Sequence, residues 1–82
     1  MLSELKDKRK VIGVKQSMKA VKADTAQHVY FAEDADPSLL EPIRSLCAEK
    51  GIPATPVETM AAIGQACEIE VGAAVAVLLK DS

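Results

Sequence analysis

The stretch HVYFAEDADP, residues 28–37, joins a strand to a helix and decides the fold. Its first six residues are rich in β-formers and show no alternation of polar and apolar side chains, which is typical of a strand covered on both faces. Asp36 followed by Pro37 is a helix start, because a short acid can cap the first turn and proline fits the first helical position. The stretch therefore predicts a central strand that leads into a helix.

The helix that starts at Asp36 is expected to end at Gly51, a typical helix terminator. Apolar side chains recur at helical spacing through this range, at Leu39, Leu40, Ile43, Leu46 and Cys47. Pro42 interrupts the pattern, because its ring would clash with an upstream carbonyl in a regular helix. We therefore expect the regular helix to begin only near Glu41.

Downstream of Gly51 the sequence predicts a strand, a helix and a second strand. IPATPV, residues 52–57, is expected to form a short strand at an exposed edge, because it carries a proline near each end. Thr59 can cap a helix from Met60 to about Cys67. EIEVG, residues 68–72, is expected to be a loop, and AAVAVLL, residues 73–79, a buried strand.

Upstream, Ser3 can cap a short helix over residues 3–9, and residues 11–12 are expected to form a brief strand that ends at Gly13. The next segment, VKQSMKAVK, is predicted to be a helix with an apolar stripe at Val14, Met18 and Val21. Helices and strands then alternate along the whole chain with short connections. This order predicts an α/β fold, a three-layer α/β/α sandwich around a small mixed four-stranded sheet, in a single domain over residues 1–82.

Charge is distributed unevenly along the 82 residues. The first 22 positions hold seven of the ten basic side chains and two acids, a local charge of +5, whereas the rest of the chain carries −7. A nucleic-acid backbone binds through local cation density, so the net charge of −2 does not exclude such a partner. It does exclude a uniformly basic protein.

Composition excludes several other classes of protein. Tyr30 and Phe31 are the two aromatic residues of the chain, which argues against a platform that stacks single-stranded bases. The longest uncharged apolar run is far shorter than a membrane helix, so we expect a cytoplasmic protein without membrane contact. Cys47 and Cys67 have no second ligand at metal spacing and are interpreted as reduced, packed thiols, and His28 as a strand residue. No cofactor and no metal is expected.

The junction of Gly13 with the following helix is the strongest candidate site. Glycine allows a sharp entry into a helix whose first amides and dipole favour anions. Lys15 and Gln16 in the first turn could read base edges, while Lys19 and Lys22 further along could meet phosphates. Alternatively, these lysines form an ordinary solvated helix face without a ligand. Regular A-form RNA hides its base edges in a deep groove, so an RNA target of this helix must be distorted.

Three ordered motifs carry a family resemblance that spans roughly residues 10–79: GVKQSMKAVK after a basic first segment, VYFAEDADP, and IGQACEIEVGAAVAVL. Together they resemble the kink-turn-binding ribosomal protein family, in particular its small bacterial ribosomal-protein-like members. Proteins of this family bind sharply bent RNA, in which a bulge is flanked by tandem sheared G·A pairs, and insert the start of their second helix at those pairs.

The resemblance implies roles for individual residues. Gly13, Lys15, Gln16 and Lys19 would meet the G·A pairs and the adjacent phosphates. The loop of Glu68, Ile69, Glu70 and Val71 would close over the bulge, with Ile69 and Val71 covering the face of an extruded base and Asp36 accepting a hydrogen bond from its edge. The alternative to an RNA contact is that Ile69 and Val71 make ordinary core contacts. The implied partner is a ribosomal or riboswitch-like RNA, without a small-molecule substrate.

The chain departs from the family pattern in two places. Many members have Asn and Glu where this chain has Lys15 and Gln16, so contacts to the guanines should be more electrostatic. Glu68 replaces a glycine that is usual before the loop. If that position needs a positive φ, Glu68 strains the loop or shifts it.

Two other function classes remain open from the sequence. Glu33, Asp34 and Asp36 could bind a divalent cation in an enzyme, but no base, nucleophile or phosphate-binding glycine loop accompanies them, so we expect no enzymatic activity. A protein–protein interaction module could use the Val14, Met18, Val21 stripe or the 69–71 loop. Burial of the stripe would remove it as a contact surface. We expect a monomer, because the chain has no spare apolar helix.

Overall fold

The computed structural model describes residues 9–80, which fold into four strands and three helices. The strands are β1 (Lys10–Ile12), β2 (Ala26–Ala32), β3 (Ala54–Val57) and β4 (Val75–Leu79), and the helices are α2 (Val14–Lys22), α3 (Pro37–Lys50) and α4 (Met60–Ala66). Apart from Arg9, the helix expected over residues 3–9 lies outside the described residues. Every other expected element is present.

The strands form one mixed sheet in the order β1-β4-β2-β3. Strand β2 pairs antiparallel with β4 and parallel with β3, and β1 pairs antiparallel with β4. The predicted central position of the strand around residues 28–33 is therefore confirmed, as is the edge position of the proline-bearing strand β3. Both inner strands, β2 and β4, are largely buried, as their continuous apolar sequences indicate.

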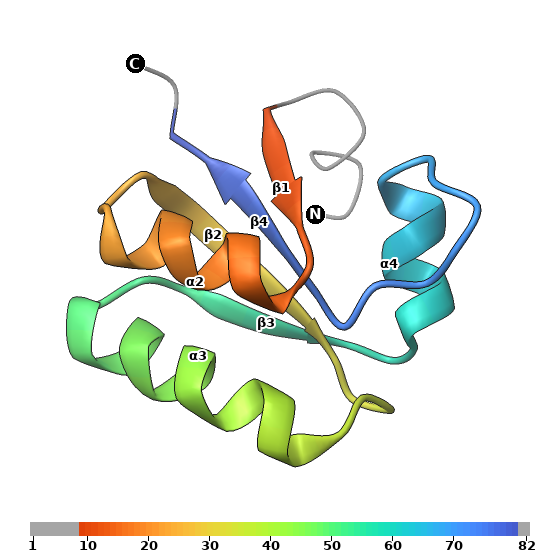
Figure 1. Cartoon of the computed structure of the whole chain (residues 1–82), viewed down its shortest axis with the longest axis horizontal. Coiled ribbons are helices and arrows are strands. Elements are labelled where there is room, and N and C mark those ends of the chain that lie inside the picture. The colour runs from red at the N-terminus through yellow and green to blue at the C-terminus, as the bar shows by residue number, and fades with distance from the viewer. Residues whose placement is uncertain (1–8, 81–82) are drawn as a thin grey trace.

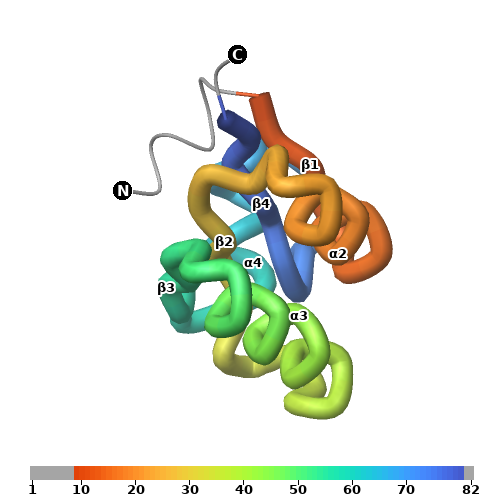
Figure 2. Tube along the Cα trace, turned by 90° about the vertical axis from the view of Figure 1, so that its left-hand side faces the viewer, coloured from red at the N-terminus to blue at the C-terminus, as the bar shows by residue number. Residues whose placement is uncertain are grey.

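Helices cover the sheet in two separate layers (Figure 1). Helices α2 and α3 pack side by side, and α2 also contacts β4, whereas α4 contacts β2, β3 and β4 away from that pair. The tube view shows α2 and α3 together on one side of the strands (Figure 2). The paired residues Phe31 and Val75 point to this side, since the Arg44 guanidinium of α3 lies over the Phe31 ring. The predicted three-layer α/β/α sandwich is confirmed.

Helix α3 differs from the expectation, because it runs without a break from Pro37 and contains Pro42. The proposed start near Glu41 was wrong. Asp36 caps the first turn by accepting hydrogen bonds from Ser38, and the buried side chains of Leu40 and Ile43 anchor the helix on both sides of the proline. Pro42 itself is exposed and removes one intrahelical donor near the helix start. Capping and burial outweigh that loss.

All three described helices end in a Schellman motif, in which a residue in the left-handed conformation turns the chain. The left-handed residues are Asp24 (φ 59), Gly51 (φ 70) and Glu68 (φ 61). After each of them, the next amide donates back to the helix, from Thr25 to Ala20, from Ile52 to Cys47 and from Ile69 to Gly64. Glu68 therefore occupies a position that favours glycine, as the comparison with the family pattern predicted it could.

Both cysteines are buried and reduced. Cys47 lies on α3, and Cys67 follows α4, so the two thiols sit in different helical layers. Burial raises the pKa of each thiol, because a buried thiolate loses its hydration. The interpretation of both as small packing residues is confirmed.

Candidate nucleic-acid interface

The connections that carry the candidate residues meet at one edge of the sheet. Strands β1, β2 and β3 end at this edge and β4 begins there, as the pairs Ile12 with Ala76 and Phe31 with Val75 show (Figure 1). The start of α2, the turn at residues 33–36 and the loop at residues 68–74 therefore lie beside one another. Two backbone hydrogen bonds hold them together, from Gly13 N to Val75 O (2.9 Å) and from Ala32 N to Ala74 O (2.8 Å).

Gly13 adopts φ 100 and ψ 153 at the start of α2, a conformation that side chains disfavour. A Cβ atom there would meet no neighbour within 4 Å, so the backbone angle and not crowding requires glycine. Among residues 9–80 no side chain caps this helix, and its first turn contains no acid. The first amides of α2 and their dipole are thus available to an anion.

Helix α2 separates its side chains as the sequence predicted. Ser17, Ala20 and Val21 are buried, and Val14 and Met18 are half-buried against the core. The polar residues of the candidate site are all exposed, namely Lys15, Gln16, Lys19 and Lys22. Because the apolar stripe packs inward, it offers no surface to a protein partner.

The four polar residues of α2 do not all lie at the edge of the sheet. Lys15 and Gln16 belong to the first turn and lie next to the loops, whereas Lys22 is in the last turn, about 10 Å away along the helix axis. Lys22 also lies close to α3, since the Lys50 ammonium approaches its carbonyl oxygen at 3.5 Å. A ligand that contacts both ends of α2 must therefore extend along the helix.

Asp36 caps α3, as the sequence predicted. Its Oδ1 accepts hydrogen bonds from the Ser38 amide (3.0 Å) and the Ser38 hydroxyl (2.9 Å), which caps α3. The bond from the Ser38 amide, more than that from the hydroxyl, lowers the pKa of this exposed carboxyl group. Both bonds end on Oδ1.

The two apolar side chains of the 68–72 loop have different surroundings. Ile69 is half-buried and packs against the core, so part of its side chain makes the core contact considered as the alternative to an RNA contact. Val71 is 70% exposed. Glu70 is exposed as well. Val71 is therefore an exposed apolar side chain at the same edge as the cationic start of α2.

Contacts between this loop and α4 were not predicted. A Cβ atom on Gly64 would collide with the backbone of Val71, and one on Gly72 would crowd the backbone of Met60. The Ala73 amide also donates to the Met60 carbonyl (3.1 Å). A glycine inside the helical pattern was the available signal, because such glycines often mark a close backbone approach.

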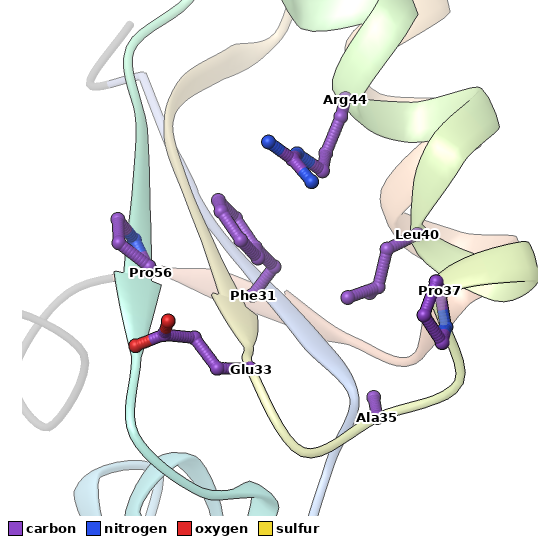
Figure 3. A pocket seen from close by; sticks show the side chains of 7 residues that line it. All are labelled: Phe31, Glu33, Ala35, Pro37, Leu40, Arg44 and Pro56. Carbon is purple, nitrogen blue, oxygen red and sulfur yellow. The ribbon is translucent and has the colours of Figure 1, made fainter.

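The three acids considered as a cation site point to different partners. Asp34 accepts a hydrogen bond from the Met60 amide of α4 (2.8 Å), and Asp36 caps α3. Glu33 lines a hollow of about 280 Å³ between β3 and the start of α3, opposite Arg44 (Figure 3). Arg44 covers the Phe31 ring there, at 5.0 Å from the ring centre. The acids therefore do not converge on one point.

Comparison with known proteins identifies the family. The model of the ribosomal protein L7Ae/L30e/S12e/Gadd45 family matches residues 2–82. The chain belongs to this family. This match confirms the family resemblance that the three sequence motifs carried. The matched residues include the whole edge described above. No described helix is long and apolar enough to cross a membrane.

Individual known proteins are similar to this chain over most of its length. An RNA-binding protein of Bacillus pumilus is 46% identical over 70 residues, which are 84% of this chain and 85% of that protein. Large ribosomal subunit protein eL8 of Haloquadratum walsbyi is 40% identical over 68 residues, 82% of this chain and 57% of that protein. Among solved structures, the Giardia lamblia 15.5kD RNA binding protein has a TM-score of 0.92 and 28% identity, covering 99% of this chain and 72% of that one.

Proposed function

We propose that this protein binds structured RNA and recognises kink-turns, bends in which tandem sheared G·A pairs flank a bulge, and that it stabilises the bent form. One observation carries the proposal: an uncapped helix start with exposed Lys15 and Gln16 lies at the same sheet edge as the loop of Val71. Relatives named as RNA-binding proteins over most of this chain support it.

The geometry favours bent RNA over a regular duplex. A helix cannot reach base edges in the deep, narrow major groove of A-form RNA. A kink opens that groove at the G·A pairs and extrudes the bulge nucleotides. The edge offers a matching pair of surfaces, since a cationic helix start and an exposed apolar side chain lie beside each other.

Each candidate residue receives a role in this proposal. The Gly13 turn lets the RNA backbone approach α2, while Lys15, Gln16 and Lys19 meet the G·A pairs and neighbouring phosphates. Lys22 meets a phosphate further along. The bulge lies on the 68–71 loop, where Ile69 supports the exposed Val71, and Asp36 accepts a hydrogen bond through Oδ2 from the extruded base. Glu70 lies beside Val71, where its carboxylate disfavours close approach of a phosphate.

The test compares a kink-turn RNA with a straight duplex of the same length and base composition. Binding is measured by fluorescence anisotropy across a series of salt concentrations. We expect tighter binding to the kinked RNA and a linear fall of log K with log salt. Equal affinity for both RNAs, or affinity that salt leaves unchanged, would contradict the proposal. Capture of protein partners without any RNA affinity would instead favour an interaction module built on the 69–71 loop.

Single substitutions test the division of roles along α2. Gln16→Ala removes a group that reads base edges, so it should weaken binding to the kinked RNA and leave straight-duplex affinity nearly unchanged. Lys22→Ala removes a phosphate contact, so it should weaken binding to both RNAs alike and reduce the salt slope by about one. Equal losses from both substitutions on both RNAs would show that no such division exists.

A further inference from the structure

Asp34 makes a contact that the proposed RNA site does not use. It lies in the turn between β2 and α3, and its Oδ1 accepts a hydrogen bond from the amide of Met60, the first residue of α4 (2.8 Å). The first amides of a helix have no partner within the helix, so this carboxylate acts as a cap supplied from another segment. Thr59 supplies a second, local cap by accepting from the Ala62 amide (3.0 Å).

The helix that Asp34 caps determines the position of the bulge-facing loop. The Ile69 amide donates to Gly64 (3.0 Å) and the Ala73 amide donates to Met60 (3.1 Å), so the loop is bonded to α4 at both of its ends. The backbone of the loop also lies directly against α4 at Gly64. A rotation or shift of α4 would therefore carry Val71 with it.

The turn that contains Asp34 also contains Asp36, two residues further along. This turn is fixed by hydrogen bonds from the Glu33 amide to Val57 (2.8 Å) and from the Ala35 amide to Ala32 (3.2 Å), and the Ala35 side chain is buried. The Asp34–Met60 hydrogen bond thus joins the segment that carries Asp36 to the helix that carries the Val71 loop.

We propose that Asp34 is a positioning residue for RNA binding, which fixes the spacing between Asp36 and Val71 through the amide of Met60. This inference rests on the proposed function. The charge of Asp34 opposes a polyanion at this edge, so its benefit to binding comes from the hydrogen bond and not from contact with RNA. Because the two segments are already joined, the bulge meets a preformed surface and no loop has to be ordered on binding.

The experiment compares Asp34→Ala with Thr59→Ala, which is a matched control. Each variant removes one side-chain cap from the start of α4, but only Asp34→Ala separates the two segments. Urea unfolding first measures the loss of stability in each variant. We then expect Asp34→Ala to weaken kink-turn affinity about tenfold, and Thr59→Ala by less than about twofold at a similar loss of stability.

A second RNA tests whether the loss arises at the bulge. The bases of the bulge are replaced by abasic sites, so that the contacts of Asp36 and Val71 to those bases are absent. On this RNA the effect of Asp34→Ala should shrink to less than about twofold, because the two changes act on the same contacts. Asp34→Asn keeps an acceptor without charge and should restore wild-type affinity on the intact RNA. Asp34→Glu, which displaces the carboxylate by one methylene, replaces Asp34→Ala if the alanine variant does not fold.

The outcomes separate this inference from the proposed function. If the wild-type protein binds the kinked RNA and Asp34→Ala binds it with the same affinity, only the role of Asp34 is overturned. Equal losses for Asp34→Ala and Thr59→Ala would also overturn it, since stability of α4 would then account for both. Absence of wild-type binding would overturn the proposed function and this role together.

Discussion

Glu68 occupies a left-handed position at the end of α4, with φ 61, where α3 has Gly51 with φ 70. In this region the conformational energy of a residue with a Cβ atom is higher than that of glycine. The same backbone hydrogen bonds form in both helices regardless of the residue.

Replacing Glu68 with glycine should therefore stabilise the protein by about 1 kcal/mol, because the backbone strain disappears. The free energy of unfolding is measured in urea. Glu68→Gln is the control, since it removes the charge and keeps the strain, and it should not raise the stability. A gain of equal size in Glu68→Gln would assign the effect to charge and not to the backbone.

Sequence reasoning at the residue scale identified exposed groups better than contacts between segments. The pattern of α2 correctly separated Lys15, Lys19 and Lys22 from the buried Val21, because helical periodicity alone fixes which face each residue occupies. The hydrogen bond of Asp34 to Met60 could not be predicted, because the two residues are 26 positions apart and only the fold brings them together.

At the scale of elements, α4 and the following loop behave as one unit. Gly64 allows this, since its Cα faces the backbone of Val71 with no space for a methyl group. Elsewhere in a helix, a change from glycine to alanine raises stability by roughly 1 kcal/mol. Here the collision involves backbone on both sides, which neither a rotamer change nor a small side-chain shift can relieve.

Gly64→Ala should accordingly destabilise the protein by at least about 2 kcal/mol, despite the better helix propensity of alanine. It should also weaken kink-turn binding by displacing Val71. Gln65→Ala, an exposed change at the next position, serves as control and should alter stability by less than about 0.5 kcal/mol. Thermal unfolding and anisotropy titrations measure the two effects. A Gly64→Ala protein as stable as the wild type would refute the close approach.

The start of α3 links its stability to pH through Asp36. The pKa of this carboxyl group lies below its ordinary value, mainly because of the hydrogen bond from the Ser38 amide and secondly because of that from the Ser38 hydroxyl. A lowered pKa in the folded state means that the contribution to stability is complete above the unfolded pKa and is lost as pH falls through the folded pKa. The cap of α3 should therefore weaken in acid.

Asp36→Asn provides the measurement, because asparagine also caps helices but does not titrate. Urea midpoints are determined at neutral pH and at about pH 3 for both proteins. We expect the wild type to lose more stability on acidification than Asp36→Asn, since the other carboxyl groups are common to both. Parallel acid profiles would exclude a role of Asp36 in the pH dependence.

The strands and helices were predictable because each has a local signal, whereas the continuity of α3 was not. Asp36 and Thr59 were recognised as caps from their residue type and position, and both accept the expected backbone hydrogen bonds. Pro42 led to a wrong helix start, because its local cost is visible in the sequence and the tertiary burial of Leu40 and Ile43 is not.

At the scale of the whole molecule, two lysines of equal charge lie at opposite ends of the sheet. Lys15 lies at the sheet edge that holds the loops, whereas Lys80 follows the far end of β4. Both lysines are exposed, so removing either changes the net charge equally. Long-range attraction to RNA depends on the total charge, whereas a direct phosphate contact depends on position.

Lys15→Ala should weaken kink-turn affinity about tenfold at low salt, and Lys80→Ala by less than about twofold. Anisotropy titrations at several salt concentrations measure both affinity and slope, and the slope should fall only in Lys15→Ala. If the two substitutions have the same effect, attraction by net charge suffices and the cationic face of α2 has no local role.

Cys47 and Cys67 provide built-in reporters of motion in the two helical layers. A thiol-specific reagent can modify each one only in molecules whose covering layer has opened, since both side chains are buried. The labelling rate of Cys47 then reports opening of the α2 and α3 layer, and that of Cys67 opening around α4. Slower labelling of Cys67 in the presence of RNA would show that the bound bulge keeps the layer around α4 closed.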